Sequence, residues 1–175
     1  MTRLPSPTPA VQPATQPASL ALYPGVSPKV LSQRAKALGQ AGELLVLSKL
    51  TRIGETVFLA GDGLPYDIFM PRRDRALRIQ VKTTTRPRGR FYQFPMNKGY
   101  RGAPGGIRPY GPDDYDLAAL VILPLDIVIF TAEKKELHSF ASCKVADLRL
   151  PQISLHYAYA TFGLSPSACA YTPHH

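Results

Sequence analysis

The sequence predicts an α/β or α+β protein built on a central mixed β-sheet. Three stretches carry this prediction: a helical pattern over residues 31–53, an alternating strand over residues 76–84, and an apolar segment over residues 116–131 that a turn divides in two. In the alternating strand every second residue from Leu77 to Val81 is apolar, which is the period of a half-buried strand. A helix followed by a run of strands packs as a layer of helix on sheet.

Residues 1–29 differ in composition from the rest of the chain. They hold seven prolines among Ala, Ser, Thr and Gln, and such a composition cannot bury enough apolar surface to fold. We therefore expect a disordered, partly polyproline-like extension, followed by a single domain over residues 30–175. Arg3 is the only early basic residue and no continuous apolar core follows it, so we expect no signal peptide.

The first element expected in the domain is a helix over residues 31–53, with Gly54 just past its end as a stop signal. Gly39 and Gly42 are unusual inside a helix, because each costs up to about 1 kcal/mol relative to Ala. Close packing of this turn against the sheet would explain both. The single acid of the helix, Glu43, lies beside the apolar stripe rather than opposite it, which is unusual for a charge that only contacts solvent.

Strand signals follow the helix. We expect strands, in order, at residues 56–60, 67–70, 76–84, 116–123 and 127–131. Residues 86–112 form a long basic insertion rich in Gly and Pro, with one strand-like piece at residues 91–94. Later the pattern weakens: residues 140–148 favour a short helix, and the chain beyond Pro151 has no clear assignment.

Positive charge is concentrated in the middle of the chain. The net charge is +9, and eleven of the 21 Lys and Arg residues lie between Arg72 and Arg108, where only Asp74 opposes them. Such a block is typical of proteins that bind the phosphate backbone of nucleic acids, although a basic surface that only aids solubility is the alternative. The side chains expected to contact DNA are Arg78, Arg86, Arg88, Arg90, Lys98 and Arg101.

Several other classes of protein are disfavoured. No apolar run reaches the roughly 18 residues that a membrane-spanning helix needs, so we expect no membrane partner. The two cysteines, Cys143 and Cys169, lack the spacing of a zinc site. Two reduced thiols and a cytoplasmic location are the expectation.

Four side chains have the chemistry that phosphodiester hydrolysis requires. Asp67 begins an expected strand, Gln80 and Lys82 share one face of the next strand, and Glu43 can approach from the helix. The four supply two carboxylates and an amide oxygen for Mg²⁺, and an ammonium for the charge that builds on the phosphate. An Asp in a turn, a Lys on a strand and a Glu on a helix are individually ordinary, so it is their joint occurrence that favours a site. Asp116 is a further candidate, but a cap at the start of a strand is its simpler interpretation.

Three short motifs resemble the active-site core of the PD-(D/E)XK nuclease superfamily: Gly42-Glu43, Tyr66-Asp67-Ile68 and Arg78-Ile79-Gln80-Val81-Lys82-Thr83. The resemblance is to the branch with Gln-x-Lys in place of Glu-x-Lys, which includes group I intron-associated homing endonucleases. Archaeal Holliday-junction resolvases share the general layout. The resemblance implies a restriction-endonuclease-like core, in which helices flank a central mixed sheet.

The resemblance also implies a role for each residue. Asp67 would be the main ligand of Mg²⁺, or of Mn²⁺ in its place, and Glu43 a second ligand or a group that orients water. Gln80 would be an amide-oxygen ligand or a water-positioning group, and Lys82 the cation that stabilises the transition state.

We therefore expect a metal-dependent DNA endonuclease. Cleavage of both strands needs two sites, so a homodimer or homotetramer is expected. A DNA- or RNA-binding module of the same fold without catalysis is the alternative, and a basic structural protein of a ribonucleoprotein particle is a third.

Overall fold

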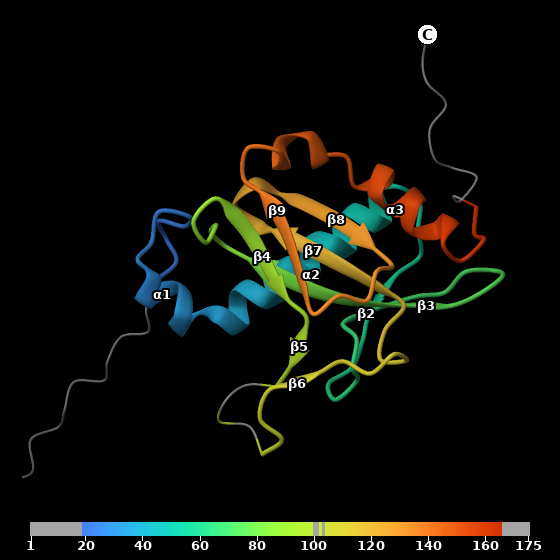
Figure 1. The fold of residues 1–175 in the computed structure, drawn as a ribbon, viewed down its shortest axis with the longest axis horizontal. Helices are drawn as coiled ribbons and strands as arrows, with labels where there is room; N and C mark the ends of the chain where they lie inside the picture. Colours follow the sequence, from blue (N-terminus) through green and yellow to red (C-terminus); the bar gives the residue numbers. More distant parts are fainter. Residues whose placement is uncertain (1–18, 100–101, 103, 166–175) are drawn as a thin grey trace, which may run out of the picture.

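A computed structural model describes residues 19–99, 102 and 104–165 of the chain. These residues form a five-stranded mixed sheet with helices packed against it, and two smaller two-stranded sheets (Figure 1). The helices are α1 (Pro28–Gln33), α2 (Ala35–Arg52) and α3 (Pro151–Ala160), with 3-10 turns η1 (Leu123–Leu125) and η2 (Val145–Leu148). The strands are β1 (Phe58–Leu59), β2 (Ile68–Met70), β3 (Leu77–Thr84), β4 (Phe91–Pro95), β5 (Asn97–Lys98), β6 (Arg108–Pro109), β7 (Leu117–Ile122), β8 (Ile127–Thr131) and β9 (Leu137–Ala141). The predicted mixed sheet flanked by helices is confirmed.

The main sheet has the order β1-β2-β3-β7-β8. Strands β1, β2 and β3 form an antiparallel meander, β3 runs parallel to β7, and β7 is antiparallel to β8. All six residues of β7 are buried, as expected for a strand covered on both faces. Strand β3 therefore lies at the centre, with β2 on one side and β7 on the other.

Helix α2 packs closely against β3. Its buried residues, Leu38, Gly42, Val46 and Leu50, recur every four positions and so form one stripe. A Cβ atom added at Gly42 would lie 1.9 Å from the side-chain oxygen of Thr83, so only glycine allows this approach. The predicted close packing of this turn is confirmed for Gly42. Gly39 has no neighbour within 4 Å of an added Cβ, so packing does not explain it.

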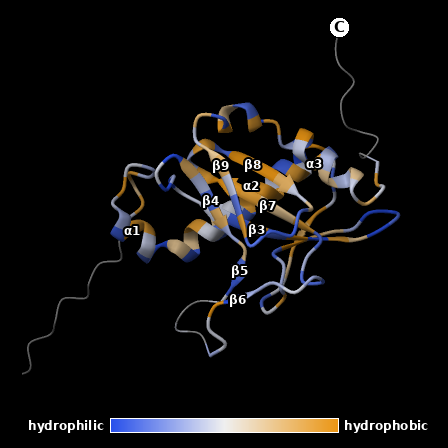
Figure 2. Ribbon diagram, in the orientation of Figure 1, coloured by the Kyte–Doolittle hydropathy of each residue, from blue (hydrophilic) through white to orange (hydrophobic). Residues whose placement is uncertain are grey.

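Two apolar layers enclose the sheet. On one face, α2 and α3 cover a core that includes Val46, Ile79 and Leu155. On the other, the β4–β9 pair covers a second core that includes Phe94 and Leu120. Figure 2 shows the apolar character concentrated in the central strands and α2, whereas the loop between β2 and β3 is hydrophilic.

Three predictions about local structure are wrong. The helix expected at residues 31–53 is two helices, because the chain leaves helical geometry at Arg34, with φ −107° and ψ 15°. Residues 140–148 do not form one helix: Phe140 lies opposite Tyr92 in the β4–β9 ladder, and η2 follows. Pairing with β4 overrides the local helical preference there. The insertion at residues 86–112 contains three strands rather than one.

The extension predicted at residues 1–29 lies partly outside the described residues, which begin at residue 19. Within the described part, Tyr23 N donates to Leu20 O at 2.8 Å and Gly25 N donates to Leu22 O at 2.7 Å, so two turns precede α1. Cys169 also lies outside, and Cys143 is an exposed free thiol. No helix in the described ranges combines the length and apolar character needed to cross a bilayer.

Candidate active site

Asp67 lies where β2 meets the centre of the sheet, one residue before the strand begins. Its backbone N–H donates to Ile79 O at 3.0 Å, which continues the β2–β3 ladder. Its carboxylate then accepts the Val81 N–H at 2.7 Å. The carboxylate thus takes the place of the backbone carbonyl that a longer β2 would offer to the Val81 N–H. This hydrogen bond fixes Asp67 against β3.

Gln80 contacts Asp67 directly across the two strands. Its side-chain Nε2 donates to Asp67 Oδ2 at 2.5 Å and to Val81 O at 3.0 Å. Both partners are acceptors, so the amide orientation follows from the hydrogen bonds. Among the described residues, no donor bonds to its Oε1. The residue is only 6% exposed, so the amide is buried on the central strand.

Lys82 lies two residues further along β3. Its ammonium donates to Asn97 O at 2.7 Å and lies 4.9 Å from the centre of the Tyr110 ring. Burial lowers the pKa of Lys82, and the charge of Asp67 partly offsets this effect. Within the described chain no Lys82–Asp67 contact shorter than 4.0 Å is present, so the ammonium is near the carboxylate without pairing to it.

Glu43 approaches from α2, immediately after the glycine that contacts Thr83. Burial raises the pKa of Glu43, and the negative charge of Asp67 raises it further. Burial also raises the pKa of Asp67, although the Val81 N–H and the Lys82 charge oppose this. Two partly buried carboxylates therefore lie within electrostatic range of each other.

The donor set fits a hard divalent cation. No group of three or more His, Cys, Asp and Glu side chains suited to a metal occurs in the part of the chain that the structure describes. Magnesium, however, is commonly held by one or two carboxylates, with water completing its shell. Glu43 and Asp67 supply two carboxylates, and a cation between them would relieve their mutual repulsion. Of the four residues that the sequence predicted, Asp67 and Gln80 are in direct contact, and Glu43 and Lys82 lie within electrostatic range of Asp67.

The sequence analysis missed Tyr110 and Asn97. Both belong to the arm around β5 and β6, which projects from the sheet in Figure 1. The Tyr110 ring lies below Lys82 and 5.6 Å from the Lys98 ammonium, and packs edge-on against Tyr115 at 5.2 Å. Burial raises the pKa of Tyr110, and the charge of Asp67 adds to this effect. No periodicity marks these residues, since both lie inside the insertion at residues 86–112, where the strands β5 and β6 are only two residues long.

Comparison with solved structures identifies the fold. The structure is similar to that of a bacterial homing endonuclease, I-Ssp6803I, with a TM-score of 0.52 and 18% sequence identity over 61% of this chain and 77% of that chain. The fold is restriction-endonuclease-like. Searches of protein-family models and of curated proteins find no match.

In this restriction-endonuclease-like fold, the basic residues expected to contact DNA fall into two groups. Arg86, Arg88 and Arg90 are exposed in the tight turn between β3 and β4, where Arg88 N donates to Phe91 O at 2.7 Å. Lys98, by contrast, forms an ion pair with Asp114. Arg101 lies outside the described residues.

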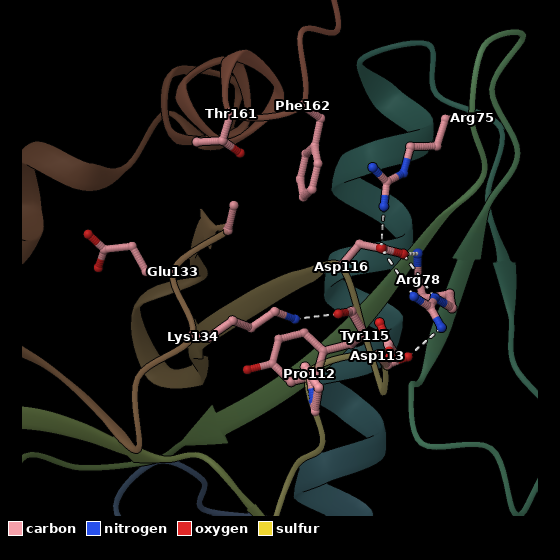
Figure 3. A pocket seen from close by; sticks show the side chains of 11 residues that line it. Arg75, Arg78, Pro112, Asp113, Tyr115, Asp116, Glu133, Lys134, Thr161 and Phe162 are labelled. Carbon is pink, nitrogen blue, oxygen red and sulfur yellow. Dashed lines mark hydrogen bonds and ion pairs between the residues drawn. The ribbon is translucent and has the colours of Figure 1, made fainter.

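Arg78 is paired within the protein. Asp116 accepts from Arg78 N at 2.8 Å, from Arg78 Nε at 3.0 Å and from Arg75 Nη2 at 2.8 Å (Figure 3). Burial raises the pKa of Asp116, but the hydrogen bonds and charge of Arg78, with those of Arg75, outweigh burial and lower it. The arrangement joins the starts of β3 and β7, which agrees with the interpretation of Asp116 as a strand cap.

Proposed function

We propose that the protein is a metal-dependent endonuclease that hydrolyses phosphodiester bonds in DNA. One observation carries the proposal: the Asp67 carboxylate is hydrogen-bonded to Gln80 across two strands, with the Lys82 charge acting to lower the pKa of Asp67 and the Asp67 charge acting to raise the pKa of Glu43. The similarity of the fold to that of a homing endonuclease supports it.

Each residue has a role in this proposal. Asp67 and Glu43 would hold Mg²⁺ or Mn²⁺, with Gln80 Oε1 as a third oxygen donor or as an acceptor that positions water. A cation held there would polarise the phosphate and lower the pKa of a bound water. Lys82 donates one N–H to Asn97 O, which leaves two for the phosphate oxygens on which negative charge develops. Asn97 and Tyr110 would keep the ammonium directed toward them.

DNA is the proposed substrate. Arg86, Arg88 and Arg90 are exposed at the end of β3 that follows Lys82, and so could contact phosphates on either side of the scissile bond. Binding by such contacts weakens steeply as the salt concentration rises. Cleavage of both strands would need two copies of the site, so we propose a homodimer or homotetramer.

Incubation of supercoiled plasmid with Mg²⁺ or Mn²⁺ tests the proposal. The wild-type protein should nick or linearise the plasmid, EDTA should stop it, and Asp67→Ala and Lys82→Ala should each remove cleavage while the circular dichroism spectrum is retained. Asp62→Ala and Lys36→Ala are matched controls, because both side chains are exposed. Metal-dependent cutting by purified Asp67→Ala protein would refute the assignment.

A binding module without catalysis is the second candidate. Two observations favour it: a neutral amide stands beside Asp67, and its nitrogen rather than its oxygen faces the carboxylate. Such a protein would bind duplex DNA or RNA with strong salt dependence, and neither metal would produce nicks. The plasmid experiment therefore separates the two candidates. A preference for RNA with no metal effect would instead indicate a structural role in a ribonucleoprotein particle.

A further inference from the structure

Two hollows on the surface each contain three cationic side chains, but their charge balance differs. The hollow in Figure 3, of about 430 Å³, is lined by the cations of Arg75, Arg78 and Lys134. Three acidic residues line it as well: Asp113, Asp116 and Glu133. The formal charge of this lining is therefore zero, and its two arginines are already bonded to Asp116.

The second hollow, of about 280 Å³, lies between the end of α2 and the start of α3. Its cations are Lys49, Arg52 and Arg149, and no acidic residue lines it. Within the described residues, none of the three forms an ion pair. Three positive charges thus face one small space without compensation. The rest of its wall includes Ile53, Pro151 and the polar side chain of Gln152.

Helix electrostatics explain only part of this arrangement. Lys49 and Arg52 lie in the last turn of α2, where cations interact favourably with the helix dipole. Arg149 instead precedes the first turn of α3, where the dipole disfavours a positive charge. An anion in the hollow would stabilise all three side chains together. A helix-end effect would stabilise only those on α2.

We propose that this hollow binds a phosphate group. Arginine guanidinium groups bind phosphate oxygens in pairs, and a lysine ammonium adds a compact charge. The hollow is separate from the candidate active site: none of the residues that line it belongs to that site, and in Figure 1 α3 lies above the main sheet and the β5–β6 arm below it. The phosphate could belong to a free phosphate ester or to a nucleic-acid backbone, and the two sources have the same chemistry at the site.

Titration of the full-length protein with inorganic phosphate, followed by NMR at constant ionic strength, tests the proposal. The backbone amides of Leu150 and Gln152 should shift and saturate. The double variant Lys49→Gln/Arg149→Gln should weaken the apparent affinity at least tenfold. Lys36→Gln is the matched control, because it removes a lysine from the first turn of the same helix, and it should leave the titration unchanged.

Duplex DNA distinguishes the two sources of phosphate. If a phosphate of the DNA backbone occupies the hollow, the double variant should release about one to two fewer counterions on binding DNA. This number follows from the slope of log K against log salt concentration. If the salt dependence is unchanged while phosphate still titrates, the ligand is a free phosphate ester. The proposal would be overturned if chloride shifted the Leu150 and Gln152 amides as much as phosphate does. It would also be overturned if the double variant bound phosphate as tightly as the wild type. The single variant Arg149→Gln, at an exposed position, gives the same test if the double variant is unstable.

This outcome is independent of the proposed nuclease activity. The phosphate titration can be repeated on Asp67→Ala protein, in which the candidate active site is disabled. A protein that cuts no plasmid but binds phosphate at the hollow would contradict the nuclease proposal alone. A protein that cuts plasmid but shows no phosphate shift at Leu150 and Gln152 would contradict the phosphate site alone.

Discussion

Asp67 and Asp116 occupy comparable positions on opposite sides of β3, yet their surroundings differ. Each precedes a neighbouring strand and accepts one β3 backbone N–H, from Val81 and from Arg78 respectively. Asp116 is also bonded to two guanidinium groups, and its pKa is lowered. Asp67 is bonded to a neutral amide, and its pKa is raised.

The difference shows how one strand supports both a structural contact and a candidate site. The charge of Asp116 is fully compensated inside the protein, so Asp116 has little to offer a ligand. The charge of Asp67 is compensated only by amide donors and by a lysine that does not pair with it. A carboxylate left in that state gains most from an added cation. Compensation of charge, rather than position along the chain, therefore distinguishes the two aspartates.

The test with the largest expected effect replaces each of the two aspartates by asparagine. Asp67→Asn should reduce metal-dependent cleavage at least a hundredfold without lowering stability at neutral pH, because the carboxylate is used for the metal and its pKa is raised in the folded protein. Asp116→Asn should lower the free energy of unfolding by about 2–3 kcal/mol, as expected for losing charged hydrogen bonds to partly exposed arginines. Urea unfolding and plasmid cleavage measure the two effects. The comparison fails if the effects of the two variants are interchanged.

The second test concerns the contact that brings Glu43 to Asp67. Gly42→Ala should destabilise the protein by about 1–3 kcal/mol, because the new methyl group would overlap Thr83. Gly39→Ala, in the same helix but with open space around it, should instead stabilise by up to about 1 kcal/mol. Thermal unfolding of both variants measures the difference. Equal effects would mean that α2 does not press against β3 at this point.

The third test uses pH. The raised pKa of Asp67 means that its contribution to stability is greatest below the ordinary carboxyl pKa of about 4 and is lost as pH rises through the folded-state value. Asp67→Asn should therefore gain stability relative to the wild type as pH rises above about 4. Asp116 has a lowered pKa, so the deficit of Asp116→Asn should be full above about pH 4 and shrink as the solution becomes more acidic. Urea unfolding midpoints of the wild type and both variants between pH 3 and pH 8 measure how the stability difference of each variant changes with pH.

The smallest expected effect concerns Tyr110, whose ring faces the Lys82 ammonium as the Phe162 ring faces the Arg75 guanidinium beside Asp116. Tyr110→Phe keeps the ring under Lys82 and should leave cleavage within a few-fold of the wild type. Tyr110→Leu removes the cation–π contact, which is worth about 0.5–2 kcal/mol, and should lower kcat by a few-fold to about thirtyfold. Single-turnover cleavage measures both. Equal loss in the two variants would indicate that the hydroxyl, rather than the ring, matters.

Local patterns were sufficient for the main sheet and for the four candidate residues. The alternation in β3 indicates which of its residues face the core, and the continuous apolar runs of β7 and β8 are typical of strands covered on both faces. The same alternation shows that Gln80 and Lys82 share a face. The cost of glycine inside a helix assigned Gly39 and Gly42 to close packing, and this is confirmed for Gly42 but wrong for Gly39.

Other features depend on contacts between distant segments. The β4–β9 pair was missed, since cross-strand pairing overrides local preference, and nothing in the residues around Arg34 marks the break between α1 and α2. Tyr110 and Asn97 reach Lys82 only through the folding of the β5–β6 arm. The sequence by itself determined the mixed sheet, the segments that form its strands and the chemical groups of the candidate site. Only the tertiary structure decided which of those groups are compensated, because charge compensation depends on distances between residues that are far apart in the chain.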